Sequence, residues 1–358
     1  MPARTRTSDW SRLPDEELLD LRFCDLKLKI EGGWLEERIQ TLYTELARRN
    51  LRLRPHCWLS EEWFSPDGVP GIALPFYLAH PRLMKLEDKQ MFDIEGGTER
   101  WCLQLLRHET GHAIDTAFRL RRRKDWRNTF GPASKPYPNS YKPKPTSKHY
   151  VLHLDWWYAQ SHPCEDFAET FAVWLQPRSR WRKRYESWPA LKKLEYVDEL
   201  MGELAGQKAP VTSRERPDSL AGNRTTLREH YAKKREHYEI NTPELYDRDL
   251  RRLFGDYSHH WNTTPARVGV PRKPRGGPGR TASAILKSNR SQLCRVCSRG
   301  TGEHPYAIDQ MLQEMVLRCR ELGLRNYRDE EQVKLDLAIF LSVQTVNYLH
   351  KGHHRIPM

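Results

Sequence analysis

The chain has 358 residues, a formal net charge of +13 and a hydrophobic fraction of 38%. Its length is sufficient for one large domain or two smaller ones, and its 12 tryptophans and 15 tyrosines supply apolar area for a core. The positive charge favours acidic partners such as nucleic acid, an anionic membrane surface or an acidic peptide. Seven scattered cysteines exclude a fully paired disulfide framework and favour a reducing compartment.

Polar residues dominate the first stretch of the chain, which lacks the apolar segment of a signal peptide. No stretch has the length and apolar character of a transmembrane helix. We therefore expect a cytoplasmic protein with no membrane span. The expected parts are a flexible tail over 1–12, a main domain over 13–260, a basic linker over 261–290 and a small helical region over 291–358. The sequence leaves the oligomeric state open.

Two helices and a short sheet are expected before residue 80. Pro14 precedes three acidic residues, which is typical of a first helical turn, and residues 33–50 repeat apolar side chains at helical spacing. In residues 51–54, leucine and arginine alternate, which is typical of a half-buried strand. Residues 68–78 are mostly apolar but contain two prolines, which favours an edge strand that can accept an added peptide strand.

A long helix over 98–124 contains the motif HETGH, which runs from His108 to His112. The two histidines are four residues apart, so both imidazoles lie on one helix face and can share a metal ion. Glu109 lies beside them, where it can act as a general base on a metal-bound water. Chance alone produces such a motif about once in twenty chains with 15 histidines, so a metal site also requires a third ligand.

A proline-rich loop over 128–148 separates this helix from a second one over 161–175. Pro163 and the two acids after it are typical of a first helical turn. Glu165 and Glu169 lie one turn apart on the same face, and their burial requires a charged partner such as a metal with its histidines. The sequence does not decide whether the loop covers the site.

The motifs HETGHAID and HPCEDFAETFA resemble those of gluzincin metallopeptidases, including the catalytic domain of anthrax lethal factor and a bacterial zinc-binding metallopeptidase family. The resemblance covers about residues 65–176. It implies a zincin-like α+β fold, mostly helical with a small β-sheet, and a zinc-dependent endopeptidase. It also implies that Glu165 is the third zinc ligand, that Glu169 orients a ligand histidine, and that Tyr158 stabilises the transition state.

Other assignments remain open from the sequence. The third ligand could instead come from His149, His153, Asp155 or His162. Asp115 could hold a ligand histidine by its second ring nitrogen, or it could be an ordinary paired acid of the helix. A metzincin site is excluded because its pattern requires glycine at position 115 and histidine or aspartate at position 118, where this chain has Asp115 and Phe118.

The expected reaction is hydrolysis of a peptide bond in a peptide or protein substrate, for which the basic surface favours acidic sequences. Zn²⁺ would lower the pKa of its water to about 7, Glu109 would pass the proton on to the leaving amine, and Tyr158 would donate to the oxyanion. The alternatives are a catalytically inactive zinc-bound interaction scaffold and a basic nucleic-acid-binding protein. The latter is not favoured, because the aromatic residues do not interleave with the basic runs.

The C-terminal region is expected to form a helical hairpin from residues 305–324 and 329–350, which have apolar side chains at helical spacing. Cys294 and Cys297 form a CxxC pair that could bind a second metal. A structural zinc site usually has a second such pair or a close pair of histidines, so free thiols are the favoured interpretation.

Overall fold

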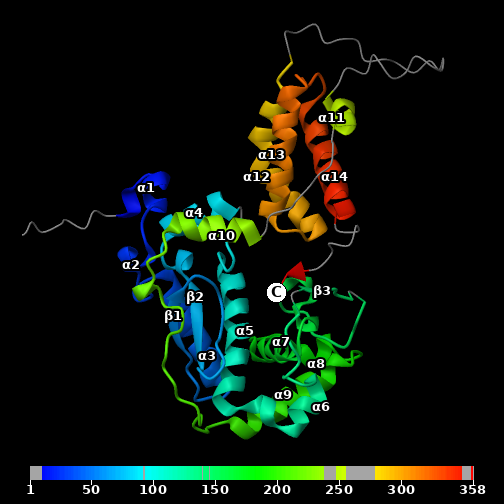
Figure 1. Cartoon of the computed structure of the whole chain (residues 1–358). Helices are drawn as coiled ribbons and strands as arrows, with labels where there is room; N and C mark the ends of the chain where they lie inside the picture. The colour runs from blue at the N-terminus through cyan, green and yellow to red at the C-terminus, as the bar shows by residue number, and fades with distance from the viewer. Residues whose placement is uncertain are drawn as a thin grey trace, which may run out of the picture. The chain divides into compact units, whose positions relative to one another are not determined.

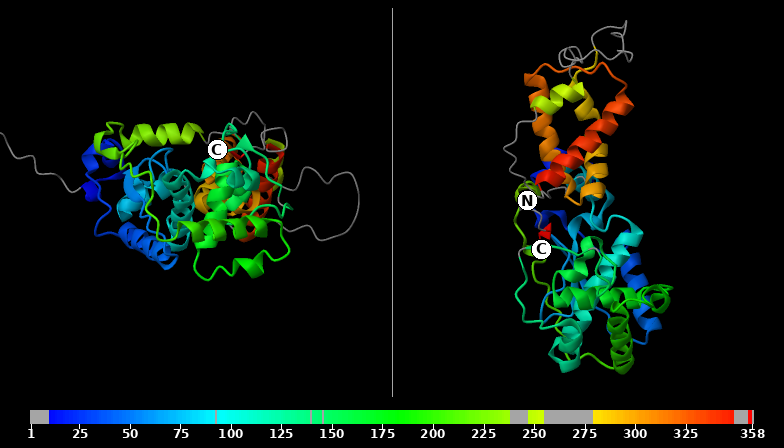
Figure 2. Two further views of the ribbon diagram at one scale, coloured as in Figure 1. Left: turned by 90° about the horizontal axis from the view of Figure 1, so that it is seen from below. Right: turned by 90° about the vertical axis from the view of Figure 1, so that its right-hand side faces the viewer.

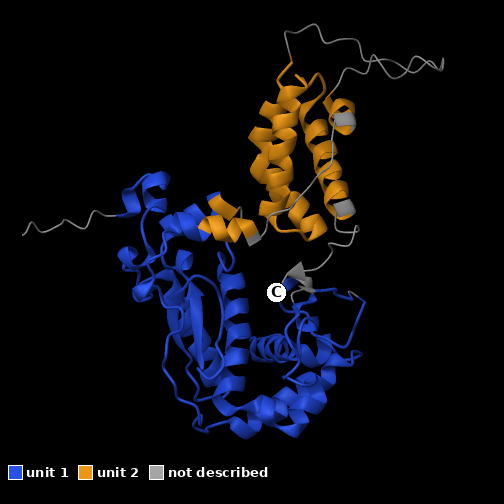
Figure 3. Ribbon diagram, viewed as in Figure 1, with its two compact units in different colours: residues 1–89, 94–230, 355–358 blue, residues 90–93, 231–354 orange. Residues whose placement is uncertain are grey.

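The computed structural model describes residues 10–91, 93–138, 140–144, 146–237, 247–254, 279–348 and 356–357. The chain divides into two compact units (Figure 3). Unit 1 comprises residues 1–89, 94–230 and 355–358, and unit 2 comprises residues 90–93 and 231–354. The described residues are mostly helical and include a two-stranded parallel sheet, which confirms the predicted α+β class.

The first part of unit 1 contains small helices, one long helix and the sheet. Its elements are α1 (Asp15–Leu19), α2 (Phe23–Leu26), α3 (Trp34–Arg48), β1 (His56–Ser60), β2 (Gly71–Pro75) and α4 (Pro81–Met91), whose last two residues belong to unit 2. Four of the apolar residues that repeat at helical spacing in α3 are buried, as predicted, whereas Trp34 is partly exposed; the four are Leu35, Ile39, Leu42 and Leu46.

The sheet pairs β1 with β2 in parallel, with Trp58 opposite Ala73. Every residue of β2 is buried, in agreement with its continuous apolar sequence. The predicted edge strand within 68–78 is β2, but its outer side is partly occupied, because the Ala73 amide donates to the Phe64 carbonyl at 2.8 Å. The strand predicted over 51–54 is not formed; the first strand begins at His56.

The second part of unit 1 carries the two helices that the sequence singled out. Its elements are α5 (Glu99–Phe118), α6 (Lys124–Phe130), β3 (Ser140–Tyr141), the 3-10 helix η4 (Asp155–Gln160), α7 (Pro163–Leu175), α8 (Trp181–Arg184), α9 (Ala190–Leu204) and α10 (Leu227–His237), which extends into unit 2. The strand β3 pairs with β4 (Ile356–Pro357) in antiparallel fashion.

Helix α5 is shorter than predicted. It ends at Phe118 because Arg119 adopts a left-handed backbone conformation with φ of 55°, so the predicted continuation to residue 124 is wrong. Arg121 instead folds back, and its main-chain N–H donates to the Asp115 carboxylate at 2.7 Å. The basic run therefore forms a turn and the start of α6.

The core of unit 1 surrounds α5, which packs against α3, β2 and α7 (Figures 1 and 2). The rings of Trp126 and Phe130 on α6 pack against Phe167 on α7 and form an aromatic cluster. Both α5 and α7 are buried over most of their length, so their polar residues are held in a low-dielectric interior.

Unit 2 is a helical bundle of α11 (Asp247–Phe254), α12 (Ala282–Thr301), α13 (Pro305–Glu321) and α14 (Glu330–Tyr348), whose apolar faces form one core. The predicted hairpin corresponds to α13 and α14, and α12 packs against both. Helix α12 begins inside the range 261–290 that was predicted as linker, and residues 261–278 lie outside the described part. The boundary between the units follows His230, inside the predicted domain of 13–260.

Cys294 and Cys297 are buried free thiols on α12. Burial raises the pKa of both, which disfavours the thiolate form that binds metals. Within the described residues, none of the helices combines the length and the apolar character that crossing a membrane requires.

Candidate metal centre

The site is built where α5 crosses α7, and local sequence defines the start of both helices. The Thr98 side chain accepts a hydrogen bond from the Trp101 amide and caps α5. The ring of His162 accepts from the Cys164 amide and caps α7, and Pro163 occupies the first turn. These caps fix the register in which the polar residues of the two helices face each other.

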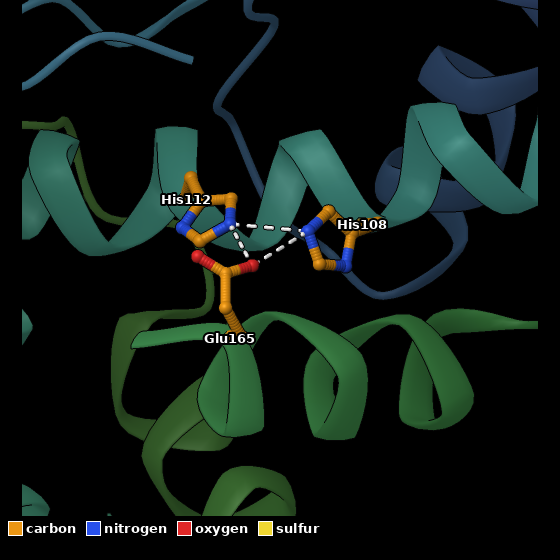
Figure 4. A group of neighbouring side chains, drawn as sticks. All are labelled: His108, His112 and Glu165. Atoms are coloured by element: carbon orange, nitrogen blue, oxygen red, sulfur yellow. Dashed lines mark hydrogen bonds and ion pairs between the residues drawn. The ribbon is translucent and has the colours of Figure 1, made fainter. Parts of the chain in front are cut away.

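Three side chains converge between the helices, as Figure 4 shows. His108 and His112 come from successive turns of α5, and Glu165 comes from the first turn of α7. The Nε2 atoms of the two histidines are 3.1 Å apart. The Oε2 atom of Glu165 is 3.0 Å from Nε2 of His108 and 3.1 Å from Nε2 of His112. In the described part of the chain, this is the group of donors spaced to hold a metal ion.

These three atoms fit zinc in type and spacing. Zinc takes histidine nitrogen and carboxylate oxygen at about 2.0–2.2 Å, which separates tetrahedral ligand atoms by about 3.3 Å. The observed separations of 3.0–3.1 Å therefore require movements of only a few tenths of an ångström. A catalytic zinc commonly has three protein ligands and an open fourth position.

The charges also favour a cation at this point. Burial opposes the charged form of His108, but the hydrogen bonds and charges of Glu165 and Glu169 raise the pKa of that imidazole well above its usual value. Burial likewise opposes ionisation of Glu165, yet His112 and His108 hold its pKa well below the usual value. Both shifts arise because buried imidazoles and buried carboxylates lie in contact with one another.

Glu169 is completely buried one turn after Glu165 and contacts His108. Its Oε1 atom is 2.8 Å from Nδ1 of His108, and its Oε2 atom accepts from the Leu154 amide at 2.9 Å. A proton on Nδ1 leaves Nε2 of His108 with a free lone pair that points to the site.

Two predicted catalytic residues border the three ligands. Glu109 is buried; burial raises the pKa of its carboxyl, and the nearby His108 and His112 partly counteract that shift. The ring of Tyr158, in η4, lies 5.6 Å from the ring of His108. Burial and the charge of Glu165 raise the pKa of the Tyr158 hydroxyl, so it remains a hydrogen-bond donor at neutral pH.

None of the four alternative ligands joins the three converging side chains. His153 contacts the Gln104 carbonyl through Nε2 at 3.0 Å, and His162 contacts the Lys135 carbonyl through Nε2 at 2.7 Å. His149 and Asp155 are exposed. The Asp115 carboxylate accepts from the main chain and the guanidinium of Arg121, as the interpretation of a paired helix acid predicted.

One residue at the site was not predicted from the sequence. Tyr137, in the proline-rich loop, donates a hydrogen bond from its hydroxyl to Oε1 of Glu165 at 2.8 Å. Its ring stacks on His162 with 3.8 Å between the ring centroids. The loop therefore reaches the site through at least this side chain. A tyrosine in a segment of prolines, serines and lysines carries no spacing pattern, so the sequence offered no signal for Tyr137.

The glycine of HETGH allows the two site helices to approach closely. A Cβ atom added to Gly111 would lie 2.6 Å from the Cα atom of Ala168, which is backbone and cannot move aside. The contact lies between His108 and His112 on α5 and beside Glu165 on α7. The small residue at position 111 therefore permits the close approach of α5 and α7 beside these side chains.

Replacing Gly111 with alanine is expected to destabilise the fold by about 1–3 kcal/mol through overpacking and to weaken zinc binding. The matched control is Gly202→Ala in α9, where an added Cβ meets no atom within 4 Å and helix propensity predicts a gain of about 0.5–1 kcal/mol. Urea unfolding with chelator present measures the stability of both variants. Equal effects of the two substitutions would show that the close approach at Gly111 is unimportant.

Comparison with known proteins gives one match. Residues 96–184 match the profile of a family described as "Putative zinc-binding metallo-peptidase". No curated protein and no solved structure shows a significant match to the chain. The matched segment contains α5, α7, η4 and the three converging side chains.

Proposed function

We propose that the protein is a zinc-dependent endopeptidase in which His108, His112 and Glu165 hold the metal and Glu109 is the general base. The observation that carries this proposal is the convergence of three ligand atoms within 3.1 Å of one another, between two buried helices of the family-matched segment. The ligand set of two histidines and one glutamate is that of the gluzincin type.

When bound, zinc acts as a Lewis acid and lowers the pKa of a coordinated water to about 7. The chain's own residues supply the proton transfers. Glu109 follows His108 directly in α5, and its raised pKa suits a group that takes a proton and later delivers it to the leaving amine. Its burial also removes competing bulk water from the carboxylate.

Tyr158 is proposed to donate a hydrogen bond from its hydroxyl to the oxyanion that develops on the scissile carbonyl. The support is its position against His108 and its raised pKa, which keeps the hydroxyl protonated. Glu169 holds the tautomer of His108 throughout the cycle. The substrate is proposed to be a peptide or protein, and the net charge of +13 favours acidic sequences.

Zinc content and proteolysis test this proposal together. The purified protein is expected to contain one zinc per chain and to cleave members of a broad peptide library. His112→Ala is expected to lose both properties, whereas His149→Ala, which changes an exposed histidine nearby, is expected to keep both. Zinc retained by His112→Ala would refute the ligand set. Absence of cleavage by the zinc-loaded protein would favour a binding scaffold over an enzyme.

A further inference from the structure

The two oxygens of Glu165 have different partners. Its Oε2 atom faces the Nε2 atoms of His108 and His112 at 3.0 and 3.1 Å. Its Oε1 atom accepts the hydroxyl hydrogen of Tyr137 at 2.8 Å. The carboxylate is therefore held with one oxygen toward the metal position and the other engaged by a neutral donor.

Tyr137 is itself anchored to the end of the helix that carries Glu165. Its ring stacks on His162 with an interplanar angle of 21°. His162 caps α7 through the Cys164 amide at 3.1 Å and contacts the Lys135 carbonyl at 2.7 Å. The phenol thus belongs to a network that joins the loop to the first turn of α7, and its position relative to Glu165 is fixed by that network.

We infer that Tyr137 is a positioning residue that holds Glu165 as a ligand through a single oxygen, so that the loop sets the zinc affinity and the coordination number of the site. This inference rests on the proposed function. A carboxylate with both oxygens free can take up a second coordination position, which would compete with the open position that a catalytic zinc requires. Hydrogen-bonded partners of metal ligands typically change metal affinity by about 10–100-fold.

The test is Tyr137→Phe, which removes the hydroxyl and keeps the ring that stacks on His162. Zinc affinity, measured by competition with a chromophoric chelator, is expected to fall about 10–100-fold. The absorption spectrum of the cobalt-substituted protein is expected to change from the strong visible bands of four-coordinate cobalt to the weaker bands of five-coordinate cobalt. The melting temperature of the metal-free protein is expected to stay the same.

The matched control is Tyr43→Phe, which removes a hydroxyl that donates to the Pro55 carbonyl at 2.6 Å. It is expected to leave zinc affinity and the cobalt spectrum unchanged. In a double-mutant cycle, Tyr137→Phe is expected to have no effect on zinc affinity once Glu165 is replaced with alanine, because the residue acts through Glu165.

The outcomes separate this inference from the proposed function. If wild-type protein binds zinc through His112 and Tyr137→Phe binds it equally well with the same cobalt spectrum, the positioning role is refuted and the metal site stands. If Tyr137→Phe weakens zinc binding equally with and without Glu165, the tyrosine does not act through that ligand. If wild-type protein binds no zinc, the proposed function itself is refuted.

Discussion

Replacing Glu109 with glutamine is expected to lower kcat for peptide hydrolysis by about 10²–10⁴-fold, the usual contribution of a general base, while zinc content stays at one per chain. The amide has nearly the same shape as the carboxyl and cannot accept the proton. Glu109 is not among the three converging ligands, so metal binding does not depend on it. The change should therefore separate catalysis from metal binding.

Steady-state kinetics on one cleaved peptide and zinc analysis of the same preparation measure the two effects. Glu99→Gln, at the exposed first position of the same helix, is the control and is expected to retain activity. A Glu109→Gln enzyme that contains zinc and cleaves at the wild-type rate would remove Glu109 from the mechanism. A variant without zinc would show that Glu109 supports the ligand arrangement.

Breaking the ion pair between Arg107 and Glu45 is expected to destabilise the protein by about 3–5 kcal/mol. The two side chains form a two-bond pair at 2.8 and 2.7 Å that joins α5 to α3, and their exposed fractions are 8% and 5%. Arg107→Met leaves the Glu45 carboxylate buried without its partner. The loss is large because that charge must then be desolvated without compensation.

The double variant Arg107→Met with Glu45→Met tests the physical reason. Since both charges are removed, its stability is expected to recover most of the loss and to approach that of the wild type. Urea unfolding measures the free energy of unfolding of the wild type, the single variant and the double variant. Chelator is present so that bound zinc adds no stabilisation. A double variant as unstable as the single one would mean that packing, and not the unpaired charge, dominates.

The parts of the site that follow from short-range geometry could be predicted from the sequence. The spacing of His108 and His112 requires only helical periodicity, and the caps at Thr98 and His162 explain why the helices start where they do. Glu165 was chosen as the third ligand from the resemblance to gluzincins and from its place on a predicted helix where a buried acid requires a charged partner. The structure provides that partner in the two histidines.

Features that depend on the path of the chain between elements could not be predicted. The basic residues that follow Phe118 were predicted to form the last turns of the helix, because cations are favourable at a helix C-terminus. The left-handed conformation of Arg119 ends α5 before them. Tyr137 reaches Glu165 only because the loop returns over α7. Helix α12 was predicted partly as linker because its first residues follow a basic, glycine-rich stretch.

The most direct test of the metal site is the anomalous difference map at the zinc absorption edge from crystals of the zinc-loaded protein. We predict one strong peak within about 2.0–2.2 Å of Nε2 of His108, Nε2 of His112 and one carboxylate oxygen of Glu165. A map without a peak between α5 and α7, including one in which zinc is bound at Cys294 and Cys297 instead, would contradict the assignment of this site as the catalytic metal centre.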